Sequence, residues 1–177
     1  AAARPTTTFT LAKTSFGTNT ARKITATTAG TSDNGKTITI VGKDHNNEDA
    51  TEVITLTGSA ETSSGTTTAF LSITSATVSA QPADNVSLGM TADVFGSVFQ
   101  GRTRVRQVNA ESGGSIGSVL FRDGSLTGTA LLTVRTSATA GDINTVNIPQ
   151  DGILYKDGAF VTFDETQCNS ATVYFDG

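Results

Sequence analysis

The sequence contains one histidine, His45, and one cysteine, Cys168, so chemistry that needs an imidazole or a thiol depends on these two residues. In a Cys–His pair or a Ser–His–Asp triad, the histidine accepts the proton of the nucleophile and has to lie beside it. Both residues fall in polar runs that predict loops, and no Gly-x-Ser-x-Gly elbow sits at a strand-to-helix turn. We therefore expect no catalytic residue, no phosphate-binding loop and no enzyme. His45 is predicted to be a solvated loop residue and Cys168 a buried or half-buried thiol.

Oxygen-bearing side chains gather at Asp44, Asn46, Glu48 and Asp49, with a spacing that resembles the first positions of a calcium-binding loop. The glycine of the sharp turn and the bidentate glutamate at the twelfth position are missing. A plain hairpin turn is the favoured interpretation, so we predict no metal and no cofactor. Sugar hydrolysis by paired carboxylates normally uses aromatic platforms as well, and the sequence has no Trp and two Tyr.

Three arginines at alternate positions, Arg102, Arg104 and Arg106, are the most informative charges. On a strand they project from one face. The intervening side chains project from the other: Thr103, Val105 and Gln107. Like charges in one strip repel each other unless acidic or phosphate groups lie opposite. Three interpretations stay open: an edge strand protected from aggregation by charge, a contact strip for another protein subunit and, with least support, a nucleic-acid contact.

The composition indicates which elements position these residues. Threonine accounts for about one residue in five, and β-branched side chains fit the pleated surface of a sheet. No segment of ten or more residues holds the apolar period of a helix, so the sequence predicts an all-β fold. The 12 basic and 16 acidic residues give a net charge of −4, unlike the basic surface of a nucleic-acid-binding domain.

Neither a membrane nor a nucleic acid is an expected partner. No apolar run approaches the roughly 18 residues that a membrane span needs. The first five residues lack the apolar core of a signal peptide. The single cysteine excludes a disulfide framework within the chain.

Runs that alternate apolar and polar residues predict hairpins along the chain. The runs 36–41 and 52–57 form one, the segment 118–135 forms another, and 6–11 with 22–28 forms a less regular one. The strongest local signal joins 153–155 to 159–163, because Asp157–Gly158 supplies the positive φ angles of a tight turn. In the run 70–80 the apolar parity changes, which predicts a bulge or turn at Thr74–Ser75.

The strands divide into two small antiparallel β-sandwich or barrel-like domains. We place a Thr-rich β domain with an extended N-terminal arm at 1–95 and a β-sandwich domain at 96–177, with the seam near 91–101. The arm, Ala1 to Leu11, either adds a strand to the sheet edge of a partner or frays. Arg4 and Pro5 in the arm are therefore candidate partner contacts, together with the three arginines.

Two groups of segments resemble structural proteins of tailed bacteriophage virions. The runs 37–44, 52–58 and 70–79 are similar to the Thr-rich β repeats of such proteins. The runs 117–124, 152–155 and 172–175 look like another small β domain found in phage head and tail proteins. These are patterns of strand and turn, so the resemblance transfers no site residue.

The resemblance implies a virion structural protein, of the capsid decoration or cement type, with tail or neck proteins as close alternatives. It implies that the chain is located in the virion, binds the major capsid protein or other virion proteins, and forms a homo-oligomer, for which a trimer is preferred. The competing hypothesis is a tail, fibre or cell-surface module that binds a receptor or glycan. Exposed clustering of Tyr155, Phe160 and Tyr174 would favour that hypothesis, whereas their burial would favour decoration.

Overall fold

The computed structural model describes residues 8–16, 20–57, 62–63, 65–149 and 151–177, which form strands and turns and no helix. Every strand pairing in this part of the chain is antiparallel. The prediction of an all-β fold is therefore confirmed. Accordingly, the same residues contain no helix that could cross a membrane.

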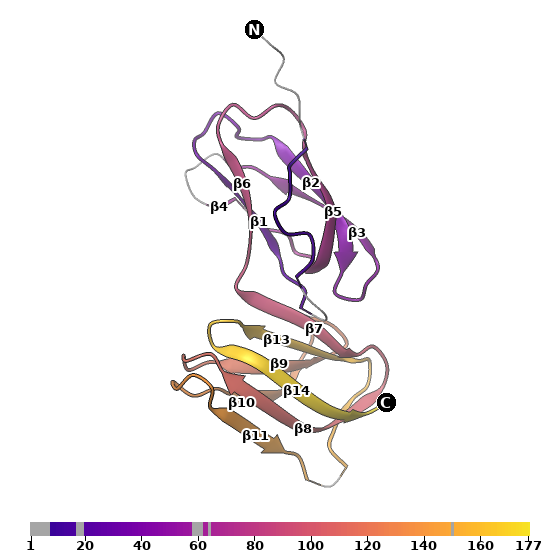
Figure 1. Ribbon diagram of the computed structural model, residues 1–177. Coiled ribbons are helices and arrows are strands. Elements are labelled where there is room, and N and C mark those ends of the chain that lie inside the picture. The colour runs from indigo at the N-terminus through magenta and orange to yellow at the C-terminus, as the bar shows by residue number, and fades with distance from the viewer. Residues whose placement is uncertain (1–7, 17–19, 58–61, 64, 150) are drawn as a thin grey trace. The chain divides into compact units, whose positions relative to one another are not determined.

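The chain divides into two compact units, Ala1–Thr91 and Ala92–Gly177. The sequence placed the division after residue 95, which lies inside β7 (Asp93–Phe99). This strand pairs with β13 (Ala159–Asp164) and so belongs to the second unit (Figure 1). Of the two glycines that interrupt the pattern there, Gly96 therefore lies within a strand, and Gly101 lies in the bend between β7 and β8.

The first unit consists of two three-stranded sheets with the strand orders β3-β2-β5 and β4-β1-β6 (Figure 1). The strand bounds are Ile24–Thr28 for β1, Thr37–Asp44 for β2, Asp49–Thr55 for β3, Thr62–Ser63 for β4, Phe70–Val78 for β5 and Val86–Met90 for β6. The predicted hairpin of 36–41 with 52–57 is confirmed, because β2 pairs with β3 along its whole length.

The core of the first unit draws buried side chains from both sheets. Their burial follows the alternation that the sequence predicts: on β2, Ile38 and Ile40 are buried and their threonine neighbours are half-buried. The buried apolar residues are Ile24, Ala26, Ile38, Ile40, Ile54, Leu56, Phe70, Ile73, Ala76 and Val78. Burial of these side chains is the main favourable contribution to the folding of this unit.

β5 contains the predicted bulge at Thr74. Ser75 pairs with Val41 and Ile73 pairs with Gly42, so Thr74 has no partner in the ladder. A bulge shifts the side-chain parity by one residue. As a result, the apolar residues on both sides of Thr74 point into one core, and the prediction of a bulge is confirmed.

Residues 8–16 lie along the edge of β5 that β2 leaves free. Thr8 forms an isolated bridge with Thr77, and the backbone N–H of Phe9 donates to the carbonyl of Ala76 at 2.9 Å. The described part of the predicted N-terminal arm therefore pairs with a sheet of its own chain. The predicted hairpin of this segment with residues 22–28 is wrong, because β1 pairs with β4 and β6 instead.

The second unit also consists of two sheets. One has the order β10-β9-β13-β7, and in the other the central strand β8 pairs with β11, β12 and β14. The remaining strand bounds are Thr103–Ser112 for β8, Ser118–Asp123 for β9, Ala130–Arg135 for β10, Ile143–Asn147 for β11, Ile153–Tyr155 for β12 and Cys168–Asp176 for β14. The core lies between the sheets and includes Val105, Val108, Val119, Phe121, Val134 and Tyr155.

The predicted hairpin in 118–135 is confirmed as β9 and β10, but the hairpin around Asp157–Gly158 is wrong. β12 pairs with β8, whereas β13 pairs with β7 and β9 in the other sheet. Gly158 does have the expected positive φ of 113°. The turn therefore sends the chain from one sheet to the other, a use of Asp-Gly that local sequence does not distinguish from a hairpin.

We predict that Gly158→Ala destabilises the second unit by more than about 1 kcal/mol, because a Cβ is penalised at positive φ. The added atom would also lie 3.0 Å from the carbonyl oxygen of Phe99 and 3.1 Å from the ring of Phe160. Gly141 is the matched control, since it has a φ of 84° and no atom within 4 Å of its Cβ position. Urea denaturation should give a clearly larger loss for Gly158→Ala than for Gly141→Ala. Equal losses would contradict the steric part of this explanation.

Candidate interaction surface

β8 is an interior strand of its sheet, and it carries two of the three predicted arginines. β14 pairs with nearly the whole of β8, while β11 and β12 pair with separate halves of it. The interpretation of the arginine strip as a protected edge strand is therefore wrong. Arg102 lies just before β8, which begins at Thr103, so the strip on the strand consists of Arg104 and Arg106.

A bulge in β8 determines which side chains reach solvent. The buried positions are spaced by two residues up to Val105, and the next one is Val108, three residues on. At the same place the pairing with β14 skips Arg106. Both Arg106 and Gln107 consequently lie outside the core, whereas strict alternation predicted that Gln107 lies opposite the arginines.

The three arginines differ in the hydrogen bonds and ion pairs that their guanidinium groups form within the chain. Arg106 donates to the carboxylate of Asp176 through both Nε and Nη2, each at 2.5 Å from Oδ2. Arg104 donates through Nη1 to the carbonyl oxygen of Asp151 at 3.2 Å. Arg102 is exposed and has no hydrogen bond or ion pair with the described residues. Of the three, Arg102 and Arg104 thus present guanidinium groups that form no ion pair with a carboxylate of the described residues.

Amide and hydroxyl side chains continue this surface across the sheet. The cross-strand rows on the outside of β8 are Thr145–Asn109–Thr172 and Asn147–Gln107–Tyr174. Gln107 Nε2 donates to Asn109 Oδ1 at 3.1 Å, which links the two rows. We call these six residues, with Arg102, Arg104 and Arg106, the polar face. A face of this kind offers many donors and acceptors to a partner, as the wet protein–protein interfaces do.

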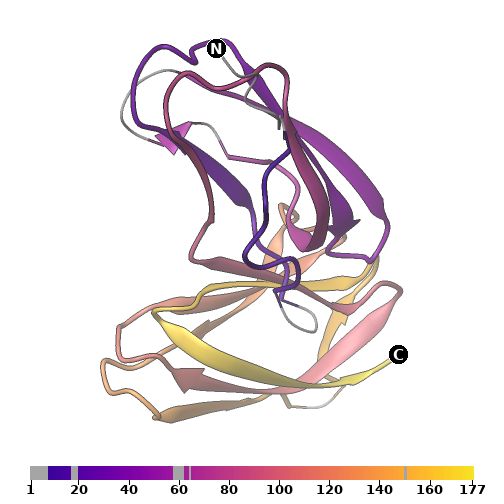
Figure 2. The ribbon, with the colours of Figure 1, turned by 45° about the horizontal axis from the view of Figure 1, so that its top comes forward.

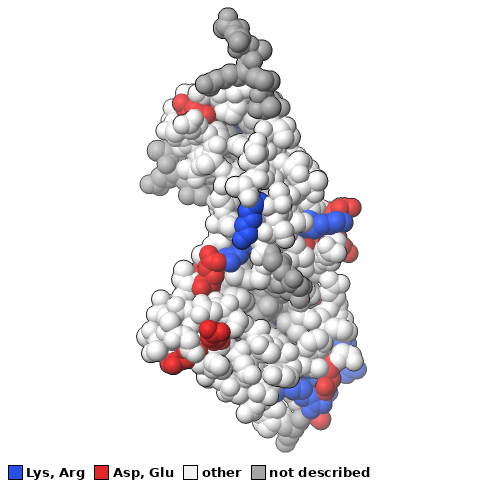
Figure 3. Space-filling model, in the orientation of Figure 1, with Lys and Arg blue, Asp and Glu red and all other residues white. Residues whose placement is uncertain are grey.

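Charged side chains are sparse on the face that Figure 3 presents, and acidic and basic groups adjoin there. This distribution fits the net charge of −4. No wide surface of one sign is visible in that view. A nucleic-acid contact, which depends on many neutralised phosphates, accordingly gains no support from it.

The three aromatic residues singled out by the sequence do not cluster in solvent. Tyr155 and Phe160 are buried, with exposed fractions of 0% and 5%, whereas Tyr174 is 51% exposed. Burial, with a smaller effect of Asp123, raises the pKa of the Tyr155 hydroxyl well above its usual value. Tyr155 is therefore a core residue, and Tyr174 is the aromatic side chain of the polar face.

His45 belongs to the first unit and Cys168 to the second. His45 is half-buried rather than solvated, and this burial lowers its pKa despite Asp44 and Glu48 nearby. Cys168 is buried at the start of β14, where burial raises its pKa and its thiol donates to the carbonyl of Ser170 at 3.2 Å. A thiol in this environment is a small apolar core group.

The acidic run after β2 is a hairpin turn, as predicted. Asp44 Oδ1 accepts hydrogen bonds from the backbone N–H groups of Asn46 at 2.8 Å and Glu48 at 2.9 Å. Asn47 between them adopts a φ of 65°, the left-handed conformation that asparagine tolerates. The described residues also contain no group of three or more His, Cys, Asp or Glu arranged to hold a metal.

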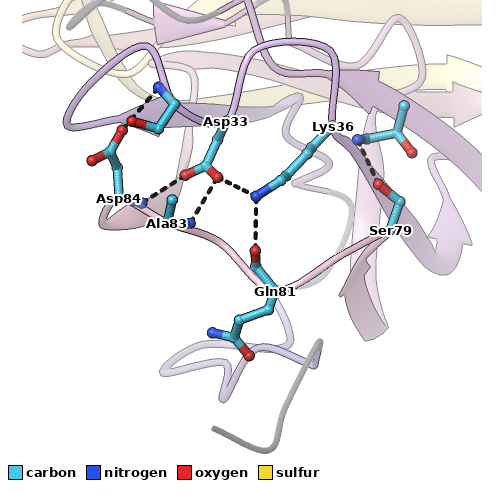
Figure 4. Close-up of polar contacts among 8 residues, drawn as sticks. Asp33, Lys36, Ser79, Gln81, Ala83 and Asp84 are labelled. Atoms are coloured by element: carbon cyan, nitrogen blue, oxygen red, sulfur yellow. Dashed lines mark hydrogen bonds and ion pairs between the residues drawn. The ribbon is translucent and has the colours of Figure 1, made fainter. Parts of the chain in front are cut away.

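Sequence reasoning missed the carboxylate of Asp33, which is 0% exposed and is the most deeply buried charge among the described residues. It accepts hydrogen bonds from Lys36 Nζ at 2.6 Å and from the backbone N–H groups of Ala83 at 2.8 Å and Asp84 at 2.9 Å (Figure 4). Lys36 Nζ also donates to the carbonyl of Gln81 at 2.7 Å (Figure 4). This cluster joins the turn before β2 to the turn before β6.

Asp33 lies in Gly30–Thr37, which does match the spacing Gly-x-x-x-x-Gly-Lys-Thr of a phosphate-binding loop, although we expected no such loop from the sequence. Such a loop needs a helix after it, so that backbone N–H groups point at the phosphate. Here the strand β2 follows, and Lys36 is held by Asp33. The arrangement therefore does not form a phosphate cradle, and Asp33 serves to connect two turns.

Arg4 and Pro5, the other two candidate contacts, lie outside the described residues. Comparison of the chain with known protein families, curated proteins and solved structures finds no match. The candidate site therefore depends on the geometry of the polar face alone.

Substitution of Asp33 tests whether the carboxylate stabilises the first unit. We predict that Asp33→Asn lowers the free energy of unfolding by about 2 to 4 kcal/mol at pH 7, because an amide cannot replace the charge and all its acceptor positions. Asp49→Asn is the control, since the side chain of Asp49 is 91% exposed in its ion pair with Lys43 and should contribute little. Urea denaturation of the two variants and the parent chain measures this difference.

The same comparison at lower pH tests the charge directly. Burial raises the pKa of Asp33, but the hydrogen bonds from Lys36, Ala83 and Asp84 outweigh it and leave the pKa below its usual 3.8. The folded chain then binds this proton less readily than the unfolded chain, so the stabilisation is complete above about pH 4 and is lost as the pH falls through the lowered pKa. The difference in the free energy of unfolding between the parent chain and Asp33→Asn should decrease below about pH 4. If this difference stayed constant down to pH 2, the charge of Asp33 would not be the source of the stabilisation.

Proposed function

We propose that the chain is a structural component of a tailed-phage virion, a capsid decoration protein that binds the outer shell and neighbouring subunits. Its partners are the major capsid protein or other virion proteins, its location is the virion, and it works as a homo-oligomer, with a trimer preferred. It is not an enzyme in this proposal. The Thr-rich strands of the first unit and the all-β architecture support this class of protein, because fold and composition suit a chain that lies on a surface.

The observation that carries the proposal is the pair of arginines in the polar face, Arg102 and Arg104, that form no ion pair with the described residues. A guanidinium group that has no carboxylate partner in its own chain gains most from an acidic group on another one. Arg102 is exposed and Arg104 uses only a backbone carbonyl, so both can accept an acidic partner without losing an internal ion pair. We expect acidic side chains of the shell or of a neighbouring subunit to contact them.

A receptor- or glycan-binding module is the second candidate. It is favoured by one observation, the exposed Tyr174 beside Gln107 in the polar face. Aromatic and amide side chains together can bind a sugar ring. Burial of Tyr155 and Phe160 leaves this single aromatic side chain on the face, which supports decoration over glycan recognition.

Replacing Arg102 and Arg104 by Ser should weaken binding to undecorated particles about tenfold or more, with the fold intact, since neither side chain belongs to the core. Co-sedimentation with particles that lack the chain measures the binding. Arg135→Ser is the matched control, because Arg135 is an exposed arginine on β10 in the other sheet. Binding of the parent chain should also fall as ionic strength rises.

The variant Arg106→Ser distinguishes an arginine that pairs within the chain from arginines that contact a partner. Because Arg106 is paired with Asp176, this variant should lose binding less than the double variant does. Normal binding by the double variant would remove the arginines from the contact surface. Binding of the parent chain to glycans of the host surface, with none to particles, would favour the second candidate.

A further inference from the structure

The outer edge of β14 is open in the second unit. β14 pairs with β8 on one side, and no other described strand pairs with it. In Figure 1 and Figure 2 it is the yellow strand that ends at the C-terminus. The edge of β5 in the first unit differs, because residues 8–16 cover it.

Hydrogen bonds on β8 determine which backbone groups of β14 face this open edge. Ser112 N–H donates to Asp142 and Ile148 N–H donates to Arg106, so the even-numbered residues of β8 bond toward β11. Bonding alternates along a strand, and the odd-numbered residues therefore bond toward β14. Their partners on β14 are Ser170, Thr172 and Tyr174. The N–H and C=O groups of Ala171 and Val173, which lie between these residues, point to the open edge.

This edge lacks the features that normally prevent strand addition. Edge strands are usually short, or carry lysine, proline or a central bulge. β14 has nine residues, and from Asn169 to Phe175 it contains neither a charge nor a proline. Its irregularities lie between Cys168 and Ser170 and between Tyr174 and Phe175, so the stretch between them is regular. Its edge can therefore accept another strand.

The regular stretch is complementary to itself. Ser170–Tyr174 is centred on Thr172, and a twofold axis there brings Ala171 of one copy opposite Val173 of the other. Each such pair exchanges two backbone hydrogen bonds, using the groups that face the edge. Ala171 and Val173 pack against the core, so their side chains stay on the inner side of the extended sheet. No like charges come opposite each other in this register.

We propose that a second copy of this chain occupies the edge of β14, by antiparallel pairing of β14 with β14 about a twofold axis at Thr172. The two β8 sheets become one continuous sheet, and the polar faces of both copies lie on one side of it. A twofold contact cannot lie within a threefold trimer, which needs head-to-tail contacts, so this pairing predicts a dimer in solution and not the trimer preferred above. The pairing rests on the strand register alone and does not depend on the proposed virion function.

Thr172→Lys tests the contact, because the axis places the two new lysines directly opposite each other. Like charges at opposed positions destabilise a strand pair, so the dissociation constant should rise about tenfold or more. Thr145→Lys is the matched control: Thr145 and Thr172 are both exposed and flank Asn109 on its two sides, but Thr145 lies away from the β14 edge. Sedimentation velocity from about 1 to about 200 µM follows the association.

The expected result is a concentration-dependent dimer for the parent chain and for Thr145→Lys, and a monomer for Thr172→Lys over the same range. Mixing Thr172→Lys with Thr172→Glu should restore a dimer, since opposite charges then face each other across the axis. Thermal unfolding confirms that each variant is folded. A monomeric parent chain, equal dissociation of both lysine variants, or an oligomer that Thr172→Lys leaves unchanged would overturn the proposal.

Discussion

Backbone hydrogen bonding by β8 is the constraint on which the second unit depends. β8 pairs with β14 along one edge and with β11 and then β12 along the other. The positions of these three strands therefore depend on β8. The bulge at Arg106 and Gln107 falls where β11 gives way to β12. A bulge increases local twist and shifts side-chain parity. The same irregularity therefore keeps both Val105 and Val108 in the core and turns Gln107 toward the polar face beside Arg106.

The strands themselves could be predicted from sequence because alternation is a local property. Ile38 and Ile40 are buried as the pattern requires, and the parity change in β5 correctly predicts a bulge at Thr74. Pairing depends on partners far along the chain, and local signals do not identify them. Gly158 has the predicted positive φ, yet its turn connects two sheets, because the partners of β12 and β13 are strands far along the chain: β8 for β12, and β7 and β9 for β13.

The candidate site was predictable only in part, for the same physical reason. Residue spacing placed Arg104 and Arg106 on one face, but the burial of charge is decided by tertiary neighbours. Asp33 looks like a surface turn residue, and its environment comes from Ala83 and Asp84, some fifty positions away. Conversely, Arg106 looks free in the sequence and is paired with Asp176. Whether a charged side chain is structural or available to a partner therefore depends on which groups of the folded chain pair with it. Sequence spacing does not identify those groups.

Sheet edges and sheet faces have different consequences for how this chain can associate. A face binds through side chains, so its specificity resides in groups such as Arg102 and Arg104 and is sensitive to salt. An edge binds through the backbone, so its strength depends on register and on the absence of charge, and salt affects it little. In this chain residues 8–16 cover the edge of β5, while the edge of β14 beside the polar face has no such cover. Arg102 and Arg104 lie at the start of β8, in the sheet whose edge β14 leaves open, so pairing of copies along β14 would bring two sets of arginines onto one surface. A partner that binds both sets would gain affinity from the second contact without any new kind of interaction.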